Sequence, residues 1–137
     1  MTKINSIYII DDDAITLFGI KKLLRRTVEC NNMYEFKNGK LALNAIMHQI
    51  ELGQSIPDVI FLDINMPIMD GWEFLNEFLK LPIDKKIIIN IVTSSIDPCD
   101  KRRWMEYKAI TKHYLEFKNK PIFSIDLEDI KRIYLAS

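Results

Sequence analysis

An uninterrupted apolar run that ends in an acid constrains this chain more than any other feature. Residues 59–62 (VIFL) lead directly into Asp63. A run with no polar break is typical of a strand buried on both faces of a sheet. A carboxylate where such a strand stops is costly unless something there uses its charge. The start of the chain repeats the arrangement, because residues 7–10 (IYII) lead into three consecutive acids, Asp11 to Asp13. We therefore predict one anionic site shared by two strand ends.

Composition limits the kind of protein in which such a site could work. The 137 residues are enough for one domain with a substantial core and too few for two. Lys plus Arg equals Asp plus Glu at 19 each, which gives no electrostatic reason to expect nucleic acid or a membrane surface as a partner. No apolar stretch approaches the length of a membrane span, and the N-terminus lacks the core of a signal peptide. We therefore expect a cytoplasmic protein.

Strand-like and helix-like patterns alternate along the chain, which is typical of an α/β domain with a mainly parallel sheet. The expected strands cover residues 4–10, 33–36, 58–62, 87–92 and 114–117, and the expected helices cover residues 17–24, 41–52, 72–79, 97–107 and 127–134. In an open parallel sheet, functional groups collect beyond the carboxyl ends of the strands. Four of the five ends carry such groups, namely Asp11 to Asp13, Asp63, Thr93 with Ser94, and Lys120.

The side chains at these strand ends suit phosphoryl transfer. Clustered carboxylates repel one another unless a cation neutralises them. Oxygen ligands without His or Cys select a hard ion, and Mg²⁺ is the natural choice because it takes one or two carboxylates together with phosphate oxygens. A nearby lysine can hold a phosphoryl group, and an aspartate can attack phosphorus to form an acyl phosphate. Phosphoryl transfer needs mainly positioning and charge neutralisation, which these residues supply.

Four separated motifs strengthen this interpretation. They are, in order, Ile10-Asp11-Asp12, residues 62–71 (LDINMPIMDG), Val92-Thr93-Ser94 and Lys120-Pro121. Together they resemble the receiver domain of two-component response regulators, over nearly the whole chain from about residue 4 to residue 134. The resemblance implies a flavodoxin-like, doubly wound sheet of five parallel strands flanked by five helices. It also implies a single receiver domain over residues 1–137, with its core at about 4–134 and no output domain.

The resemblance assigns roles at the acidic end of the sheet position by position. Asp63 matches the phosphoacceptor. Asp12 matches the acid that binds Mg²⁺ directly, and Asp11 matches the acid that acts on the metal through water. Asn65 matches the position whose main-chain carbonyl completes the metal site. Asp13 is expected to be exposed or to cap a helix.

Three further positions match the parts of the family that respond to phosphorylation. Thr93 matches the switch hydroxyl that turns toward the phosphoryl group, and Lys120 matches the lysine that pairs with that group. Phe117, three residues before Lys120, matches the aromatic switch. The family often has a cis peptide bond before the proline that follows the lysine, and Lys120-Pro121 is chemically able to form one.

The resemblance therefore implies a stand-alone response regulator of a phosphorelay. A sensor histidine kinase or a histidine phosphotransfer protein would donate the phosphoryl group, and a downstream protein target would read the altered surface. Mg²⁺-dependent phosphotransfer and slow self-dephosphorylation are modest activities, so the word enzyme describes such a chain only in part. We expect no nucleic-acid and no membrane partner. The identity of the kinase and of the target, and whether phosphorylation produces a dimer, stay open.

Two other functions remain as alternatives. A phosphatase of the haloacid dehalogenase type also uses an aspartate nucleophile at a strand end. Such an enzyme needs a second acid two residues later, where this chain has Asn65. A phosphorylation-independent, receiver-like interaction module would keep the fold without the chemistry. The intact set of Asp12, Asp63, Thr93 and Lys120 disfavours that alternative.

Single positions also have simpler interpretations. The acids at 11–13 could complement the N-terminus of a helix, and Thr93 could cap the next helix. Lys120 could be a solvated loop residue, and Phe117 could be an ordinary core aromatic residue. The four motifs together favour the site interpretation for the acids, Thr93 and Lys120.

Overall fold

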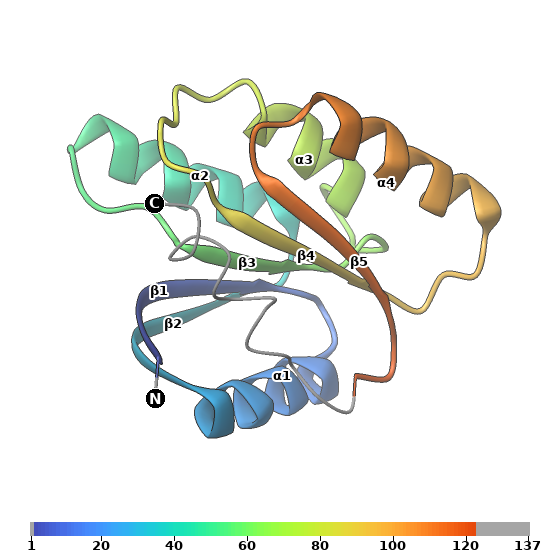
Figure 1. Ribbon diagram of the computed structural model, residues 1–137, viewed down its shortest axis with the longest axis horizontal. Helices are drawn as coiled ribbons and strands as arrows, with labels where there is room; N and C mark the ends of the chain where they lie inside the picture. Colours follow the sequence, from blue (N-terminus) through green and yellow to red (C-terminus); the bar gives the residue numbers. More distant parts are fainter. Residues whose placement is uncertain (1, 123–137) are drawn as a thin grey trace.

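The structure is a computed structural model in which residues 2–122 are described (Figure 1). Strands and helices alternate along these residues. The strands are β1 (Thr2–Ile10), β2 (Val28–Phe36), β3 (Val59–Leu62), β4 (Ile88–Thr93) and β5 (Tyr114–Asn119), and the helices are α1 (Ala14–Thr27), α2 (Gly39–Glu51), α3 (Gly71–Phe78) and α4 (Pro98–Ile110). The fifth helix, predicted on residues 127–134, lies outside the described residues.

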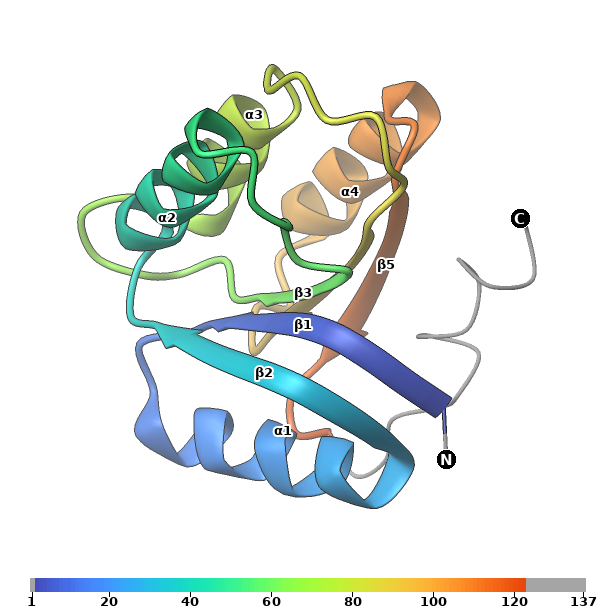
Figure 2. The same ribbon diagram turned by 90° about the vertical axis from the view of Figure 1, so that its left-hand side faces the viewer.

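The five strands form one parallel sheet in the order β2-β1-β3-β4-β5. Helix α1 lies on one face of the sheet, and α2, α3 and α4 lie on the other (Figure 2). The doubly wound α/β fold predicted from the sequence is therefore confirmed. The neighbouring strands β1 and β3 are followed by helices on opposite faces. In open parallel sheets, ligands bind beyond the carboxyl ends of two such strands.

Burial on both faces explains the long apolar runs. Every residue of β3 and β4 is buried, as expected for central strands of a covered parallel sheet. One hydrophobic cluster includes Ile60 of β3 together with Phe74 and Phe78 of α3. The other includes Phe61 of β3 and Leu24 of α1. Because successive side chains of a strand point to opposite faces, β3 is anchored in both clusters.

Short polar side chains define where the helices begin. In each of the four described helices, an Asp or Asn at the N-cap accepts a hydrogen bond from a backbone N–H of the first turn. The caps are Asp13, Asn38, Asp70 and Asp97. Asp13 is exposed and caps α1, in agreement with the role expected for it. None of the described helices is long and apolar enough to cross a membrane.

Strand β2 is longer than predicted. It begins at Val28, directly after α1, whereas the sequence pattern predicted only residues 33–36. The missed part carries exposed polar side chains, including Glu29, Asn31 and Asn32. Strand β2 lies at the edge of the sheet and pairs with β1. An edge strand that is partly open to solvent does not need the apolar pattern on which the prediction relied.

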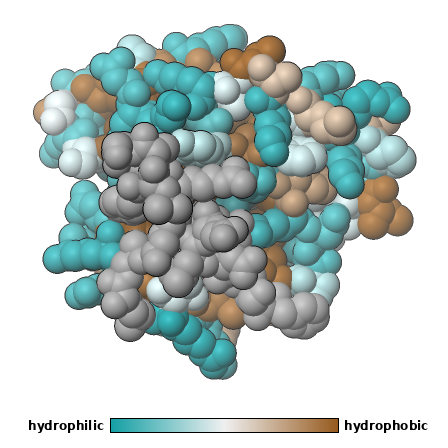
Figure 3. Space-filling model, in the orientation of Figure 1, coloured by the Kyte–Doolittle hydropathy of each residue, from teal (hydrophilic) through white to brown (hydrophobic). Residues whose placement is uncertain are grey.

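Helix α4 lacks a buried apolar face. It ends at Ile110, three residues beyond the predicted end, and contains no buried residue. Pro98 lies in its first turn, where proline is tolerated. Hydrophilic and hydrophobic residues are interspersed over α4 and the β5 edge in the space-filling view (Figure 3). Partly buried and polar contacts, rather than core burial, therefore hold α4 to the domain.

Candidate functional site

The carboxyl ends of four strands bring their functional residues together on one side of the sheet. Asp11 follows β1, Asp63 follows β3, Thr93 ends β4 and Lys120 follows β5. Backbone hydrogen bonds between neighbouring strands continue into these positions. The Asp63 N–H donates to the last carbonyl of β1 at 2.9 Å, and the Lys120 N–H donates to the Thr93 carbonyl at 2.8 Å. The parallel sheet therefore brings together residues that lie up to about a hundred positions apart in the sequence.

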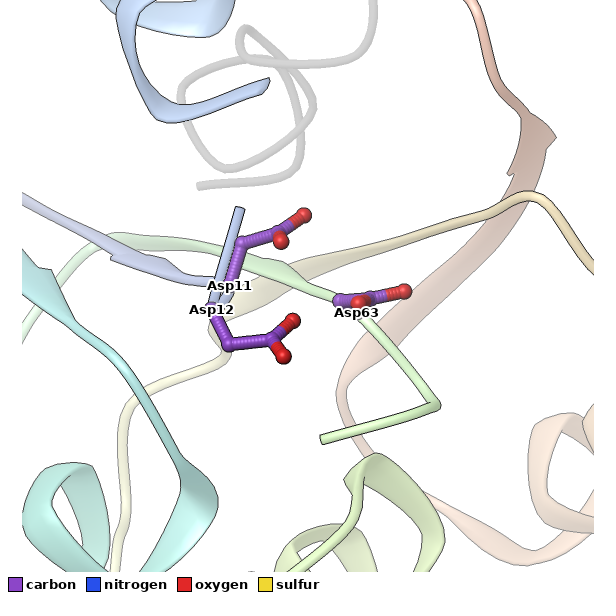
Figure 4. Close-up of side chains that lie close together, drawn as sticks. All are labelled: Asp11, Asp12 and Asp63. Carbon is purple, nitrogen blue, oxygen red and sulfur yellow. The ribbon is translucent and has the colours of Figure 1, made fainter. Parts of the chain in front are cut away.

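Three carboxylates form the centre of the site. One carboxylate oxygen from each of Asp11, Asp12 and Asp63 lies within 4.8 Å of the other two (Figure 4). Asp11 and Asp63 are buried, with 2% and 5% of their surface exposed, whereas Asp12 is exposed. Asp13 instead accepts hydrogen bonds within the first turn of α1. The structure thus groups Asp11 and Asp12, rather than Asp13, with Asp63.

Lys120 lies between the two buried acids. Its Nζ atom is 2.9 Å from Asp11 Oδ2 and 3.5 Å from Asp63 Oδ1. Backbone groups also donate to both acids, from Asp13 to Asp11 Oδ1 at 2.8 Å and from Ile64 to Asp63 Oδ1 at 2.9 Å. The contacts of Asp63 are therefore made through Oδ1. The peptide bond from Lys120 to Pro121 is cis, as the resemblance allowed.

Burial and neighbouring charges shift the pKa values of three groups at the site. Burial, followed by the negative charge of Asp11, raises the pKa of Asp63 to about 6, although Lys120 partly opposes the shift. Burial likewise raises the pKa of Asp11, against the hydrogen bonds from Asp13 and Lys120. Burial alone would lower the pKa of Lys120, but the hydrogen bond to Asp11 and the charge of Asp63 raise it. The site therefore favours a further cation that would keep its acids ionised.

The donor set fits Mg²⁺. The three acids offer only oxygen ligands, which hard divalent cations prefer. Ligand oxygens of an octahedral Mg²⁺ are roughly 3.0 Å apart when adjacent and roughly 4.2 Å apart when opposite. The three carboxylates are near enough to approach one ion, since an oxygen of each lies within 4.8 Å of the others. Asn65 lies exposed on the loop that follows Asp63. The part expected for its main-chain carbonyl stays a prediction.

The loop after Asp63 is packed tightly against the start of α3. The Gly71 N–H donates to the Ile64 carbonyl at 2.8 Å. A Cβ atom at position 71 would lie 2.3 Å from the carbonyl oxygen of Asp63, so the close approach requires glycine. Asp70 and Glu73 form a capping box at the same helix end. The Asp70-Gly71 pair was part of the recognised motif, but the sequence reasoning assigned it no structural role.

The two predicted switch residues occupy different environments. Thr93 is fully buried, and its Oγ1 accepts a hydrogen bond from the Ser95 N–H at 3.1 Å. Thr93 does not cap α4, because Asp97 does. Phe117 is half-buried, and the centre of its ring lies 5.8 Å from that of Trp104 in α4. Phe117 thus packs beneath α4, while its role as a switch stays a prediction.

Comparison with known proteins finds a matching family and curated relatives that are response regulators. The response regulator receiver domain family matches residues 7–122. The nitrate/nitrite response regulator NarL of Escherichia coli K12 is 31% identical over 90 residues, and the match covers 65% of this chain and 38% of NarL. This chain therefore spans well under half of that curated relative.

Two solved structures resemble the whole domain. A two-component response regulator from Cytophaga hutchinsonii has a TM-score of 0.80 at 28% identity, covering 98% of this chain and 99% of that chain. A response regulator receiver protein from Dyadobacter fermentans has a TM-score of 0.70 at 26% identity, covering 95% and 98%. Together with the family match over most of its length, these likenesses show that the chain belongs to the response regulator receiver domain family.

Proposed function

We propose that this chain is a single-domain response regulator that accepts a phosphoryl group on Asp63. A histidine kinase or a histidine phosphotransfer protein donates the group, and the phosphorylated chain signals by contact with a downstream protein. A cytoplasmic location and Mg²⁺ dependence are parts of the proposal. Membership of the receiver family supports the proposal, because receiver domains accept phosphoryl groups in phosphorelays.

One geometric relationship carries the proposal. The Lys120 ammonium lies between Asp11 and Asp63, beside a carboxylate cluster able to hold a divalent cation. A transferred phosphoryl group carries negative charge on its oxygens, so it needs cations on more than one side. Lys120 supplies one positive charge, and a metal held by Asp12 and Asp63, with Asp11 acting through water, would supply another. Asp63 contacts Lys120 and belongs to the same carboxylate cluster, so it lies beside both sources of positive charge.

The transfer itself is a displacement at phosphorus. An Asp63 carboxylate oxygen attacks, the new O–P bond forms, and the P–N bond to the donor histidine breaks. The imidazole nitrogen leaves with the electron pair of that bond and takes up a proton. Bound Mg²⁺ would neutralise charge on the phosphoryl oxygens. Lys120 is close enough to exchange its contact with Asp63 for one with a phosphoryl oxygen, and the Thr93 hydroxyl can donate to another.

The residue two positions after Asp63 influences how long the acyl phosphate lasts. A carboxylic acid there could move a proton to or from an attacking water. Asn65 occupies this position and its amide cannot transfer protons. We therefore propose that the chain stores the phosphoryl group as a signal rather than turning over phosphate esters. No observation favours the phosphatase alternative.

Intact-mass measurement after incubation with acetyl phosphate and Mg²⁺ tests the proposal. We expect one phosphoryl adduct on the wild-type chain and none on Asp63→Asn. Asp12→Asn should lose most of the Mg²⁺ affinity measured by calorimetry, because it removes a ligand. Asp13→Asn is the matched control, since asparagine caps a helix as well as aspartate does and position 13 lies outside the cluster. Absence of any adduct on folded wild-type protein would refute the proposal and favour the interaction module.

A further inference from the structure

Two tryptophans hold α4 against the rest of the domain. Trp72 of α3 donates its indole N–H to Asp100 Oδ1 at 2.9 Å, and its ring stacks on Tyr107 with 5.8 Å between ring centres. Trp104 of α4 donates its indole N–H to the Leu115 carbonyl of β5 at 3.0 Å. Because α4 has no buried residue, these contacts are a large part of what fixes its position.

Ser95 connects the Trp72 contact to Thr93. The Ser95 N–H donates to Thr93 Oγ1 at 3.1 Å, and the Ser95 hydroxyl donates to Asp100 Oδ2. Asp100 thus accepts from Ser95 with one oxygen and from Trp72 with the other. We call these four residues, Thr93, Ser95, Asp100 and Trp72, the Ser95 relay. The two hydrogen bonds to the Asp100 carboxylate are charge-assisted, which makes them stronger than bonds between neutral groups.

The relay reaches both sides of the acidic cluster. Trp72 directly follows Gly71, whose backbone N–H is bonded to the loop after Asp63. At the other end, the Thr93 carbonyl accepts from the Lys120 N–H. The Ser95 relay therefore adjoins the loop after Asp63 at one end and Lys120 at the other.

We propose that Ser95 and Asp100 are positioning residues that set the orientation of the Thr93 hydroxyl and couple it to Trp72. This inference rests on the proposed switch role of Thr93. Rotation of the Thr93 side chain away from the Ser95 N–H breaks the first bond of the relay, so Ser95 and then Asp100 lose a fixed partner. Coupling between two sites is reciprocal, so the Trp72 contact also biases the orientation of Thr93.

The indole N–H signal of Trp72 reports directly on its contact with Asp100. The signal is easy to identify, because Trp72 and Trp104 are the only tryptophans of the chain. Their nitrogen–proton NMR signals can be assigned with Trp72→Phe and Trp104→Phe. In the unphosphorylated protein, we expect Ser95→Ala and Thr93→Val to shift the Trp72 signal. Ser95→Thr, which keeps the hydroxyl, should restore the wild-type position. Glu106→Gln is the matched control. Glu106 is an exposed residue of α4 that lines a surface pocket together with Trp72, but it is outside the Ser95 relay.

The second part of the experiment uses beryllofluoride with Mg²⁺ as a mimic of the phosphoryl group. Loading is measured by fluorine NMR, independently of the indole signals. We expect loading to shift the Trp72 signal in the wild type and in Glu106→Gln, and the shift to fall by at least half in Ser95→Ala and Asp100→Ala at equal loading.

Two results would overturn the relay. One is a Trp72 signal that stays in place in unphosphorylated Ser95→Ala and Thr93→Val. The other is a loaded wild type whose Trp72 signal does not move, or moves equally in all variants. A wild type that binds no beryllofluoride would count against the proposed function instead, and the unphosphorylated variants alone would then decide whether the relay exists.

Discussion

Lys120 Nζ lies 2.9 Å from Asp11 Oδ2, so a lysine already neutralises one acid of the proposed metal site. Lys120→Gln should therefore have two opposite effects at pH 8. Mg²⁺ should bind more tightly, by about threefold or more, because a competing positive charge is gone. Phosphorylation by acetyl phosphate should become slower, because the phosphoryl oxygens lose a cation.

Calorimetry with Mg²⁺ and time-resolved intact mass measure these two effects. Lys22→Gln, an exposed lysine of α1, is the matched control and should change neither. Weaker Mg²⁺ binding in Lys120→Gln would show that the lysine organises the acids rather than competing with the metal.

Asp63 should make the metal-free domain less stable at neutral pH than in mild acid. Its pKa is about 6 in the folded protein, mainly because of burial, against about 3.9 for an unperturbed aspartate. The folded state therefore binds more protons between these values, so the stability from this group is complete below pH 4 and lost as pH rises through 6. Asp63→Asn should raise the free energy of unfolding by on the order of 2 kcal/mol at pH 8, and by much less at pH 4.5.

Urea unfolding in the presence of a chelator at both pH values checks this expectation. Asp13→Asn, at an exposed cap of α1, should leave stability nearly unchanged at both. A stability gain in Asp63→Asn that is equal at pH 8 and pH 4.5 would contradict an ionisation origin.

His113 should make the domain less stable as pH falls, which is the opposite of the effect of Asp63. Its Nδ1 accepts the Ile87 N–H at 3.0 Å, and burial, assisted by the charge of Lys112, lowers its pKa to about 4. An unfolded histidine titrates near 6.5. Between these values the unfolded chain binds more protons, so stability is lost as pH falls from 6.5 toward 4. His113→Ala should cost about 1–3 kcal/mol at pH 7, because it leaves a buried N–H without its acceptor, and the cost should shrink toward pH 4.

Thermal unfolding as a function of pH measures the effect of His113→Ala. His48→Ala is the control, because His48 is exposed on α2. A cost for His113→Ala that is the same at pH 4 and pH 7 would show that packing against Phe78, rather than the neutral ring nitrogen, is what matters.

Two glycine-to-alanine substitutions should have opposite signs. In Gly71→Ala the new methyl group meets the Asp63 carbonyl oxygen at 2.3 Å, and relief requires a shift of the loop that follows Asp63. We expect a loss of about 1–3 kcal/mol, as for overpacking, together with weaker Mg²⁺ binding. In Gly19→Ala nothing lies within 4 Å of the new atom, and alanine favours helix α1 by about 1 kcal/mol. Chemical denaturation of both variants, with Mg²⁺ titration of each, tests the contrast.

The sequence predicts the central part of this fold well and its margins less well. Strands β3 and β4 are buried on both faces, so their apolar runs have one simple interpretation. The first half of β2 lies on an edge and carries Asn31 and Asn32, so no pattern marks it as a strand. Helix α4 has no buried face to generate a period, and its predicted end fell three residues short of Ile110.

The topology of the sheet was enough to predict which residues of the site lie close together, but not which of them contact one another. Once the strands are parallel, Asp11, Asp63, Thr93 and Lys120 must share one edge of the sheet. That Lys120 contacts Asp11 more closely than Asp63 depends on side-chain geometry that no motif encodes. The Ser95 relay was also missed, because Ser95 and Asp100 are ordinary helix-start residues in sequence, and Asp100 acquires its partner Trp72 only when α3 and α4 meet.

The absence of a buried residue in α4 has a consequence for how this domain can change over evolutionary time. Core substitutions commonly cost several kcal/mol, whereas surface substitutions cost little. Outside the few positions that contact Trp72 and β5, the residues of α4 can therefore vary almost freely without loss of the fold. A receiver domain built in this way can acquire a new binding partner by changing one helix, while the sheet and its acidic site stay as they are.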